Sequence, residues 1–248
     1  MVISIKNKKE IKLMRTGGKI SARVLNILGK AARPGITSRD LDILAEKTIR
    51  KLGGEPAFKG HGGYPASTCI SINDTIVHGI PSDGVIKNGD LVGIDVGVKY
   101  KDFYTDTAAT FPVGEVTKEA NRLLKITKKS LEKAIKAIKP GKYLGDIQSL
   151  IQKTIEKEGF GVIKSLSGHG VGRNLQEEPS IPNFGKEKTG PVLKEGMTLA
   201  IEPMVSAGEW QTKTLDDGWT VKIADGSLSA HFEHTILVTK NGAEILTQ

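Results

Sequence analysis

Two aspartates lie on neighbouring segments that have the residue pattern of a β-hairpin. Asp95 stands between the β-branched residues Ile94 and Val96, and successive residues of a strand face opposite sides, so the carboxylate points away from both. Asp106 follows a turn at residues 100–103. In a hairpin of this length the two aspartates can share one face, opposite or diagonal to each other. Carboxylates that close repel each other unless a proton or a cation lies between them.

Two glutamates repeat this arrangement in the second half of the chain. Glu202 occupies the position that corresponds to Asp95 in an internal repeat, and Glu233 lies on the next predicted strand, as Asp106 does. The first pair alone fits edge charges in water as well as it fits a site. With the second pair, a pseudo-twofold axis through the domain would bring all four carboxylates together, which favours the site.

A histidine could complete such a cluster of acids. His169 lies between Gly168 and Gly170, in a predicted loop where the backbone can approach other groups closely. Without the acids beside it, His169 would be interpreted as a loop histidine whose ring only makes hydrogen bonds. With the acids beside it, the imidazole is a candidate nitrogen ligand for a metal ion. Four acids and one imidazole suit hard or borderline divalent ions such as Mn, Fe(II), Co or Zn.

The elements that must position these side chains are themselves repeated along the chain. Pro34-Gly35 is followed by apolar residues at helical spacing and then by a glycine, and the same pattern follows Pro140-Gly141, 106 residues later. The triplet Gly-His-Gly at 60–62 corresponds to the one at 168–170. We therefore expect a single domain over residues 1–248, built from half-repeats at approximately 8–114 and 118–248.

Each half is predicted to contain two helices followed by strands. The long helices span about residues 8–32 and 118–138 and end before proline and glycine, and Thr37 is the expected N-cap of the shorter helix in the first half. Helices paired with hairpins, without strict βαβ alternation, predict an α+β fold with a central, largely antiparallel sheet and outer helices. Strands are predicted at 69–72, 90–98, 104–111, 198–201 and 232–238.

Composition narrows the class of protein. The 248 residues carry a formal net charge of +8 with a pI near 9.4, which fits an anionic partner or only a lysine-rich surface. Cys69 is the single cysteine, so no disulfide framework holds the chain together. The first residues lack a signal-peptide pattern, and no apolar run is long enough to span a bilayer. We expect a cytoplasmic monomer without membrane association.

Six short motifs together resemble those of the type I methionine aminopeptidases over nearly the whole chain. They are VHGIP at 77–81, IDV at 94–96, TDT at 105–107, GHGVGR at 168–173, IEPM at 201–204 and EHT at 233–235. Any one of them is weak, whereas the set is specific. The resemblance implies a catalytic domain with the pita-bread fold of the creatinase and aminopeptidase families. It also implies two divalent metal ions, bridged by Asp106 and Glu233, with His169 and Glu202 completing one shell and Asp95 the other.

The implied activity is removal of the N-terminal methionine from nascent proteins whose second residue is small. The metal ions would polarise a water molecule, and Glu202 would take and return its proton. His78 resembles the family histidine that hydrogen-bonds the scissile amide, although without the resemblance a turn histidine is a serious competitor. For the methionine side chain, the resemblance implies an apolar pocket formed by Tyr64, Cys69, Leu175 and Trp219.

One position departs from the family pattern. The family has a second histidine seven residues after the ligand His169, where this chain has Gln176. An amide can still donate a neutral N–H to a developing oxyanion, but it cannot transfer a proton. We therefore expect an active enzyme with a reduced rate or an altered specificity. His61 lies near the substrate loop and has no assigned role.

Two other functions stay open from the sequence. An X-Pro peptidase of the same fold would keep the metal ligands and change the substrate, but those relatives usually carry an N-terminal domain. A catalytically impaired or non-enzymatic binding protein on this fold is favoured by Gln176 and disfavoured by the five intact ligands.

A further hypothesis concerns association with the ribosome. Basic residues crowd one long helix, where they are most often a solvated face, and could dock the enzyme on ribosomal RNA near the peptide exit. We expect no binding to DNA. The residues are Lys118, Arg122, Lys125, Lys128, Lys129, Lys133 and Lys136.

Overall fold

Four α-helices lie on one side of the molecule, within residues 2–248, which the computed structural model describes. Two of them begin at a capping box, in which side chains satisfy free backbone N–H groups: Asn7 with Glu10 at α1, and Thr37 with Asp40 at α2. The prediction of Thr37 as an N-cap is confirmed. The helices are α1 (Lys8–Ala31), α2 (Ser38–Lys51), α3 (Lys118–Ala137) and α4 (Leu144–Glu156), and η1 (His61–Gly63) is a 3-10 turn.

The strands form one large sheet and two small ones, and the paired strands of the described residues run antiparallel. The large sheet has the order β1-β4-β5-β14-β9-β7-β8, with β2 paired to β4 and β15 paired to β14, and the small sheets have the orders β13-β10-β6 and β11-β12-β3. The strands are β1 (Glu55–Pro56), β2 (Cys69–Ile72), β3 (Thr75–Val77), β4 (Leu91–Tyr100), β5 (Phe103–Pro112), β6 (Gly161–Val162), β7 (Ser167–Gly170), β8 (Glu177–Pro182), β9 (Thr198–Ile201), β10 (Met204–Ser206), β11 (Thr212–Thr214), β12 (Val221–Ile223), β13 (Ser229–His231), β14 (Glu233–Thr239) and β15 (Gly242–Ile245).

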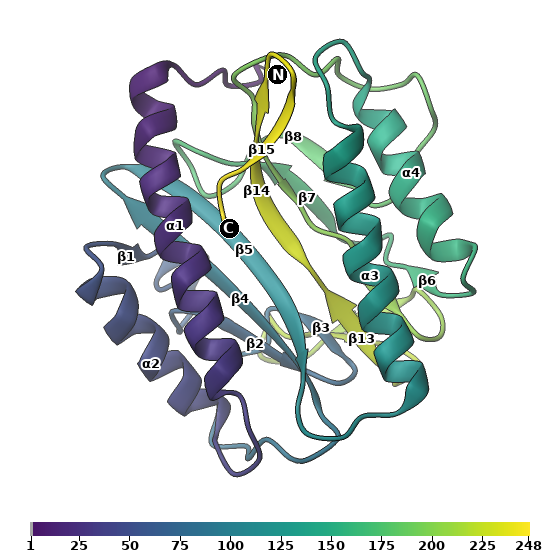
Figure 1. Ribbon diagram of the computed structural model, residues 1–248. Helices are drawn as coiled ribbons and strands as arrows, with labels where there is room; N and C mark the ends of the chain where they lie inside the picture. Colours follow the sequence, from purple (N-terminus) through teal and green to yellow (C-terminus); the bar gives the residue numbers. More distant parts are fainter. Residues whose placement is uncertain (1) are drawn as a thin grey trace.

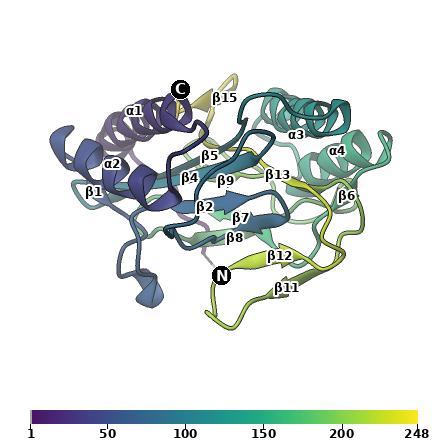
Figure 2. The same ribbon diagram turned by 90° about the horizontal axis from the view of Figure 1, so that it is seen from below.

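The four helices cover one face of the large sheet, and β11 and β12 lie on its other side (Figures 1 and 2). Helix α1 contacts β4 and β5, whereas α3 contacts β9 and β15. Each helix pair encloses a hydrophobic core against its half of the sheet: Leu28, Leu41 and Ile94 belong to the first core, and Leu123, Ile147 and Leu199 belong to the second. The opposite face of the sheet is therefore free to carry polar side chains.

The same backbone contacts recur in the two halves of the chain. The N–H of Gly35 donates to the carbonyl oxygen of Ile86 at 2.9 Å, and the N–H of Gly141 donates to that of Leu193 at 2.9 Å. Isolated β-bridges join Thr37 to Val85 and Tyr143 to Val192. These pairs are separated by the same 106 or 107 residues that separate the repeated motifs in the sequence.

The predicted elements agree with the structure where the local pattern is strong. The long helices end one residue earlier than predicted, and the five predicted strands are present with ends shifted by at most two residues. The strands β1, β3, β6–β8, β10–β13 and β15 are not among the predicted ones. Apart from β8 they have at most four residues, too few for an alternating pattern to be recognised in the sequence. No helix in residues 2–248 has both the length and the apolar character needed to cross a membrane.

Candidate metal centre and substrate cavity

The five predicted metal ligands come from five strands that are consecutive neighbours in the large sheet. The order β4-β5-β14-β9-β7 runs through its centre, and Glu202 is the first residue after β9. Strand neighbours in a sheet lie about 5 Å apart, so side chains at one level of the sheet converge. The ligand candidates in this strand order are Asp95, Asp106, Glu233, Glu202 and His169.

The register places the acids on one face of the sheet. Asp95 pairs with Ala108, whereas Asp106 pairs with Gly97, so the two aspartates are diagonal neighbours. Glu233 pairs with Ala108 from the other side of β5. The neighbours of Asp95 in the chain, Ile94 and Val96, are buried in the core under α1 and α2, so the carboxylate faces away from the helices.

Several oxygen atoms of this cluster are buried without a hydrogen-bond partner. They are Oδ1 of Asp95, Oδ1 of Asp106 and both carboxylate oxygens of Glu233. Ligand atoms of Asp106, His169 and Glu233 all lie within 4.8 Å of one another. Unpartnered buried acceptors are costly, whereas oxygen and imidazole donors that converge in this way are what a divalent cation requires. The residues present therefore fit a metal ion.

Burial governs the charge of the four acids. It is the largest cause that raises the pKa of Asp95, Asp106 and Glu233, and the carboxylate of Asp106 raises the pKa of Asp95 and Glu233 further. Burial also raises the pKa of Glu202, to about 8, against the lowering effect of His169. The cluster cannot hold four negative charges at neutral pH on its own, so it requires protons or a cation.

His169 lies on a strand and not in the loop that the sequence predicts. It belongs to β7, where it pairs with Ala200 of β9 and with Ser180 of β8. Its glycine neighbours are needed for this close approach: a Cβ on Gly168 would lie 2.4 Å from the carbonyl oxygen of Ala200, and a Cβ on Gly170 would lie 2.2 Å from that of Glu178. The imidazole is therefore held by a strand that is paired on both sides, and not by a loop.

The two ring nitrogens of His169 have different neighbours. Nδ1 lies 2.8 Å from the carbonyl oxygen of Gly170, which can only accept a hydrogen bond, so Nδ1 carries the proton. Nε2 is then an acceptor and lies 3.6 Å from Oε1 of Glu202. Fixing the proton on Nδ1 leaves the Nε2 lone pair free, which is the arrangement of a metal-ligating histidine.

A second imidazole, which the sequence analysis did not assign, lies on the far side of Glu202. His231 is 4% exposed, and its Nε2 lies 3.4 Å from Oε2 of Glu202 without the geometry of a hydrogen bond. Burial lowers the pKa of His231 to about 4. One signal in the sequence could have found it: His231 precedes Glu233 by two residues, and residues two apart in extended chain share a face.

The acids open into one cavity of about 830 Å³, whose lining also includes the substrate-pocket candidates. Tyr64, Cys69 and Leu175 are buried and pack in one apolar cluster with Trp219. The rings of Tyr64 and Trp219 meet edge to face at 5.2 Å, and Cys69 pairs with Asp95 across β2 and β4. The apolar wall is therefore continuous with the cluster of acids, and the structure brings the two sets of predicted residues together.

His78 and Gln176 line the same cavity from different elements. His78 has a left-handed backbone (φ 57°) and is half-buried, and burial lowers its pKa. Gln176 is exposed, in the loop before β8 that also presents Leu175. His61, whose role the sequence leaves open, is an exposed residue of the lining.

Similarity to known proteins fits this geometry. The model of metallopeptidase family M24 matches residues 12–240. The chain belongs to metallopeptidase family M24. The methionine aminopeptidase of Clostridium perfringens is 49% identical to this M24 peptidase over 246 residues, which cover 99% of each chain. The crystal structure of the methionine aminopeptidase from Thermotoga maritima matches it with a TM-score of 0.99 and 51% identity over 100% of both chains.

A more distant branch of the fold is also similar to this M24 peptidase. The match to the prolidase from Pyrococcus furiosus covers 98% of the chain of this M24 peptidase and 65% of the prolidase chain, with 27% identity and a TM-score of 0.79. These similarities confirm the pita-bread fold and the resemblance to the methionine aminopeptidases that the motifs indicate. This M24 peptidase is a metal-dependent aminopeptidase.

Proposed function

We propose that the protein removes the N-terminal methionine from polypeptides whose second residue is small. One observation carries the proposal: a buried apolar wall of Tyr64, Cys69 and Leu175 adjoins the cluster of acids in a single cavity. A flexible thioether side chain suits such a wall, and the peptide bond that follows it would then lie beside the acids. The full-length similarity to proteins named methionine aminopeptidase supports this substrate.

We propose that the five ligand candidates hold two divalent metal ions. Four buried oxygen atoms without partners in Asp95, Asp106 and Glu233 support more than one cation. Bound metal supplies a polarised water molecule whose pKa is lowered from about 15.7 towards neutrality. The side chain of Glu202 is 11% exposed, and its carboxylate would take a proton from that water and return it to the leaving amine.

The remaining cavity residues would position the substrate. Trp219 would close the methionine pocket with the apolar wall, because its ring packs on Tyr64. His78 would hydrogen-bond the scissile amide, and its imidazole faces the ring of Trp219 at 6.5 Å. Gln176 would donate an N–H group to the substrate carbonyl from the exposed rim. Its amide carries no positive charge, so we expect slower turnover than a histidine there would give.

Residues 1–248 would act as a single catalytic domain of half-repeats at approximately 8–114 and 118–248. The hydrogen bonds that recur at a constant offset support this division. The metal ligands are divided between the halves, since Asp95 and Asp106 come from the first and the other three from the second. Catalysis would therefore require both halves together.

The alternative substrate, an X-Pro peptide, has weaker support. The prolidase match has 27% identity, against 51% for the Thermotoga maritima methionine aminopeptidase. A non-enzymatic role would leave the buried acids of the cavity without a use. Methionine release from Met-Ala-Ser, compared with release from an X-Pro peptide at equal concentration, separates the three functions, because a binding protein would cleave neither.

The role of the acids is tested by a matched pair of variants. Asp106→Asn keeps the shape of a buried candidate ligand and removes its charge, and Asp102→Asn makes the same change at an exposed position of the β4–β5 turn. We expect Asp106→Asn to lose at least about 10²-fold in kcat/KM for Met-Ala-Ser and Asp102→Asn to be unchanged. Equal activity of both variants would contradict the proposed centre.

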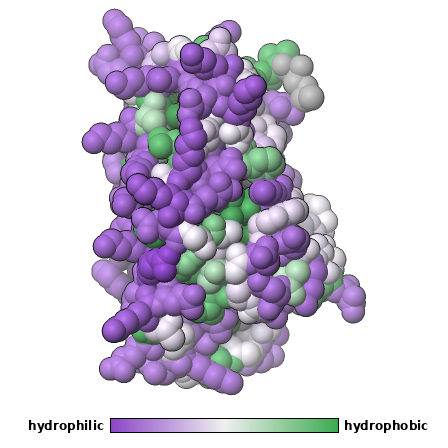
Figure 3. All heavy atoms as spheres, turned by 90° about the vertical axis from the view of Figure 1, so that its right-hand side faces the viewer, coloured by the Kyte–Doolittle hydropathy of each residue, from purple (hydrophilic) through white to green (hydrophobic). Residues whose placement is uncertain are grey.

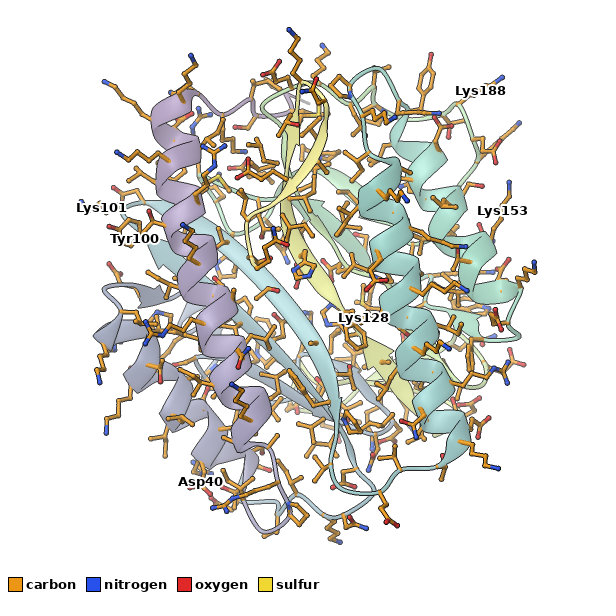
Figure 4. All side chains as sticks on the ribbon, in the orientation of Figure 1. Asp40, Tyr100, Lys101, Lys128, Lys153 and Lys188 are labelled. Carbon is orange, nitrogen blue, oxygen red and sulfur yellow. The ribbon has the colours of Figure 1, made fainter. Side chains whose placement is uncertain are left out.

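Association with the ribosome, in the cytoplasm, completes the proposal. The side of the molecule that carries α3 and α4 is mainly hydrophilic (Figure 3), and the exposed Lys128 lies on the edge of α3 that faces the middle of the molecule (Figure 4). Phosphate contacts made by such lysines would weaken steeply with salt. We expect cosedimentation with ribosomes that falls between about 50 mM and 200 mM salt. Cosedimentation that is absent or insensitive to salt would contradict this part.

A further inference from the structure

Nε2 of His231 is a buried polar atom without a hydrogen-bond partner in a residue that lines the cavity. The structure leaves its Nε2 without a hydrogen bond in a residue that is 4% exposed. A polar atom in this position is costly unless it bonds another group when the site works. The acceptor beside Nε2 is Oε2 of Glu202, and the two atoms lie 3.4 Å apart.

The backbone holds His231 in this place. Its N–H donates to Oγ1 of Thr110 at 2.9 Å, and its carbonyl oxygen accepts from the same hydroxyl at 2.9 Å. Met204 pairs with His231 across β10 and β13, which fixes the imidazole against the segment that follows Glu202.

The two oxygens of Glu202 face different imidazoles. Oε1 lies 3.6 Å from Nε2 of His169, a nitrogen whose lone pair is free for a metal ion, and Oε2 lies 3.4 Å from Nε2 of His231. One oxygen of the carboxylate therefore faces the candidate metal ligand His169, and the other faces the possible hydrogen-bond donor His231. A residue that hydrogen-bonds one oxygen of a ligating carboxylate fixes the orientation of the second oxygen. Such hydrogen bonds increase the affinity of a site for its metal ion.

We propose that His231 is a positioning residue for Glu202. Its Nε2–H donates to Oε2, so that Oε1 is presented to metal on the side of His169 and the carboxylate is held towards the reacting atoms. The inference rests on the proposed metal-centre function of Glu202. A protonated Nε2 donates whether the ring is neutral or charged, so the bond requires one tautomer and no change of charge.

Three substitutions of His231 test the bond. Gln places its amide nitrogen near the position of Nε2, Asn places it near Nδ1, and Leu removes the donor. We expect His231→Leu and His231→Asn to lower the Mn²⁺ affinity measured by isothermal titration calorimetry about tenfold or more, and His231→Gln to restore it to within about threefold of the parent. At saturating Mn²⁺, kcat for Met-Ala-Ser should follow the same order while KM changes less than about twofold.

A matched control comes from a half-buried histidine on the strand that follows, β14. His234 bonds Oγ1 of Thr247 through Nδ1 and does not line the cavity, so His234→Gln should leave Mn²⁺ affinity unchanged. If His231→Leu does not fold, the Gln and Asn variants still decide the question, because both are polar amides. Equal affinity in the Gln and Asn variants, or parental affinity in the Asn variant, would overturn the proposal.

The calorimetric result is independent of the substrate. If the parent protein releases no methionine, the proposed function fails, whereas the order of Mn²⁺ affinities still tests His231. If the parent is active and the affinities are equal, the inference fails and the proposed function stands.

Discussion

Lys6 and Glu177 form an ion pair that is almost completely shielded from water. Their side chains are 1% and 7% exposed, and the pair joins the segment before α1 to Glu177, the first residue of β8, directly after the loop that carries Leu175 and Gln176. Replacing Lys6 by Met leaves a buried carboxylate without its counter-charge, which costs roughly 3–5 kcal/mol. Glu177 keeps one hydrogen bond, from the N–H of Asn174 at 2.9 Å. We therefore expect the free energy of unfolding to fall by about 3 kcal/mol.

Urea denaturation followed by circular dichroism measures this loss. The double variant Lys6→Met/Glu177→Gln removes the buried charge as well, so it should be more stable than Lys6→Met by at least about 1 kcal/mol. The loop positions Leu175 in the pocket wall, so KM for Met-Ala-Ser should rise more than kcat falls, with Mn²⁺ affinity unchanged. A loss below about 1 kcal/mol, or a double variant no more stable than Lys6→Met, would refute the reasoning.

Three further predictions follow from the site. Burial raises the pKa of Glu202 to about 8 from an ordinary 4.5, so the metal-free folded state keeps a proton that the unfolded state releases. The lowered pKa of His231 acts in the opposite direction below about pH 6.5, so the melting temperature of the protein in EDTA should fall as pH rises from about 6.5 to about 8, and a rise over that range would contradict this. Gly168→Ala brings a Cβ to 2.4 Å from the carbonyl oxygen of Ala200. We expect urea denaturation to show a free energy of unfolding lower by about 1–3 kcal/mol, and Mn²⁺ binding to be weaker. Parental values of both would show that β7 can shift. Burial raises the pKa of the Cys69 thiol, so iodoacetamide should label it only in the unfolded protein, and fast labelling of the native protein would place it in solvent.

Local patterns predict a large part of this fold. Helix periodicity and capping residues such as Thr37 act over a few residues, so the helix boundaries differ from prediction by one residue. The hairpin that carries Asp95 and Asp106 is also local, because a short turn joins its strands and sets their register. The internal repeat extends this information to Glu202, which local propensity alone would not connect with the aspartates.

Long-range pairing accounts for what the sequence did not predict. The glycines on either side of His169 predict a loop. In the structure, their lack of a Cβ instead allows β7 to pack closely against β9 and β8. The sequence assigns no role to His231 because the nearby Glu202 comes directly after a different strand, 29 residues earlier. Alternation shows which residues share a face of one strand, whereas it does not show which side chains of two strands meet.

We propose that five side chains from both halves of the chain bind the divalent metal that the aminopeptidase uses. Anomalous X-ray diffraction at the manganese edge, from crystals grown with Mn²⁺, tests it most directly. We expect anomalous density for two ions among Asp95, Asp106, His169, Glu202 and Glu233, and loss of that density in Asp106→Asn. Density confined to another part of the molecule, or two ions retained in Asp106→Asn, would show that these side chains do not form the metal centre.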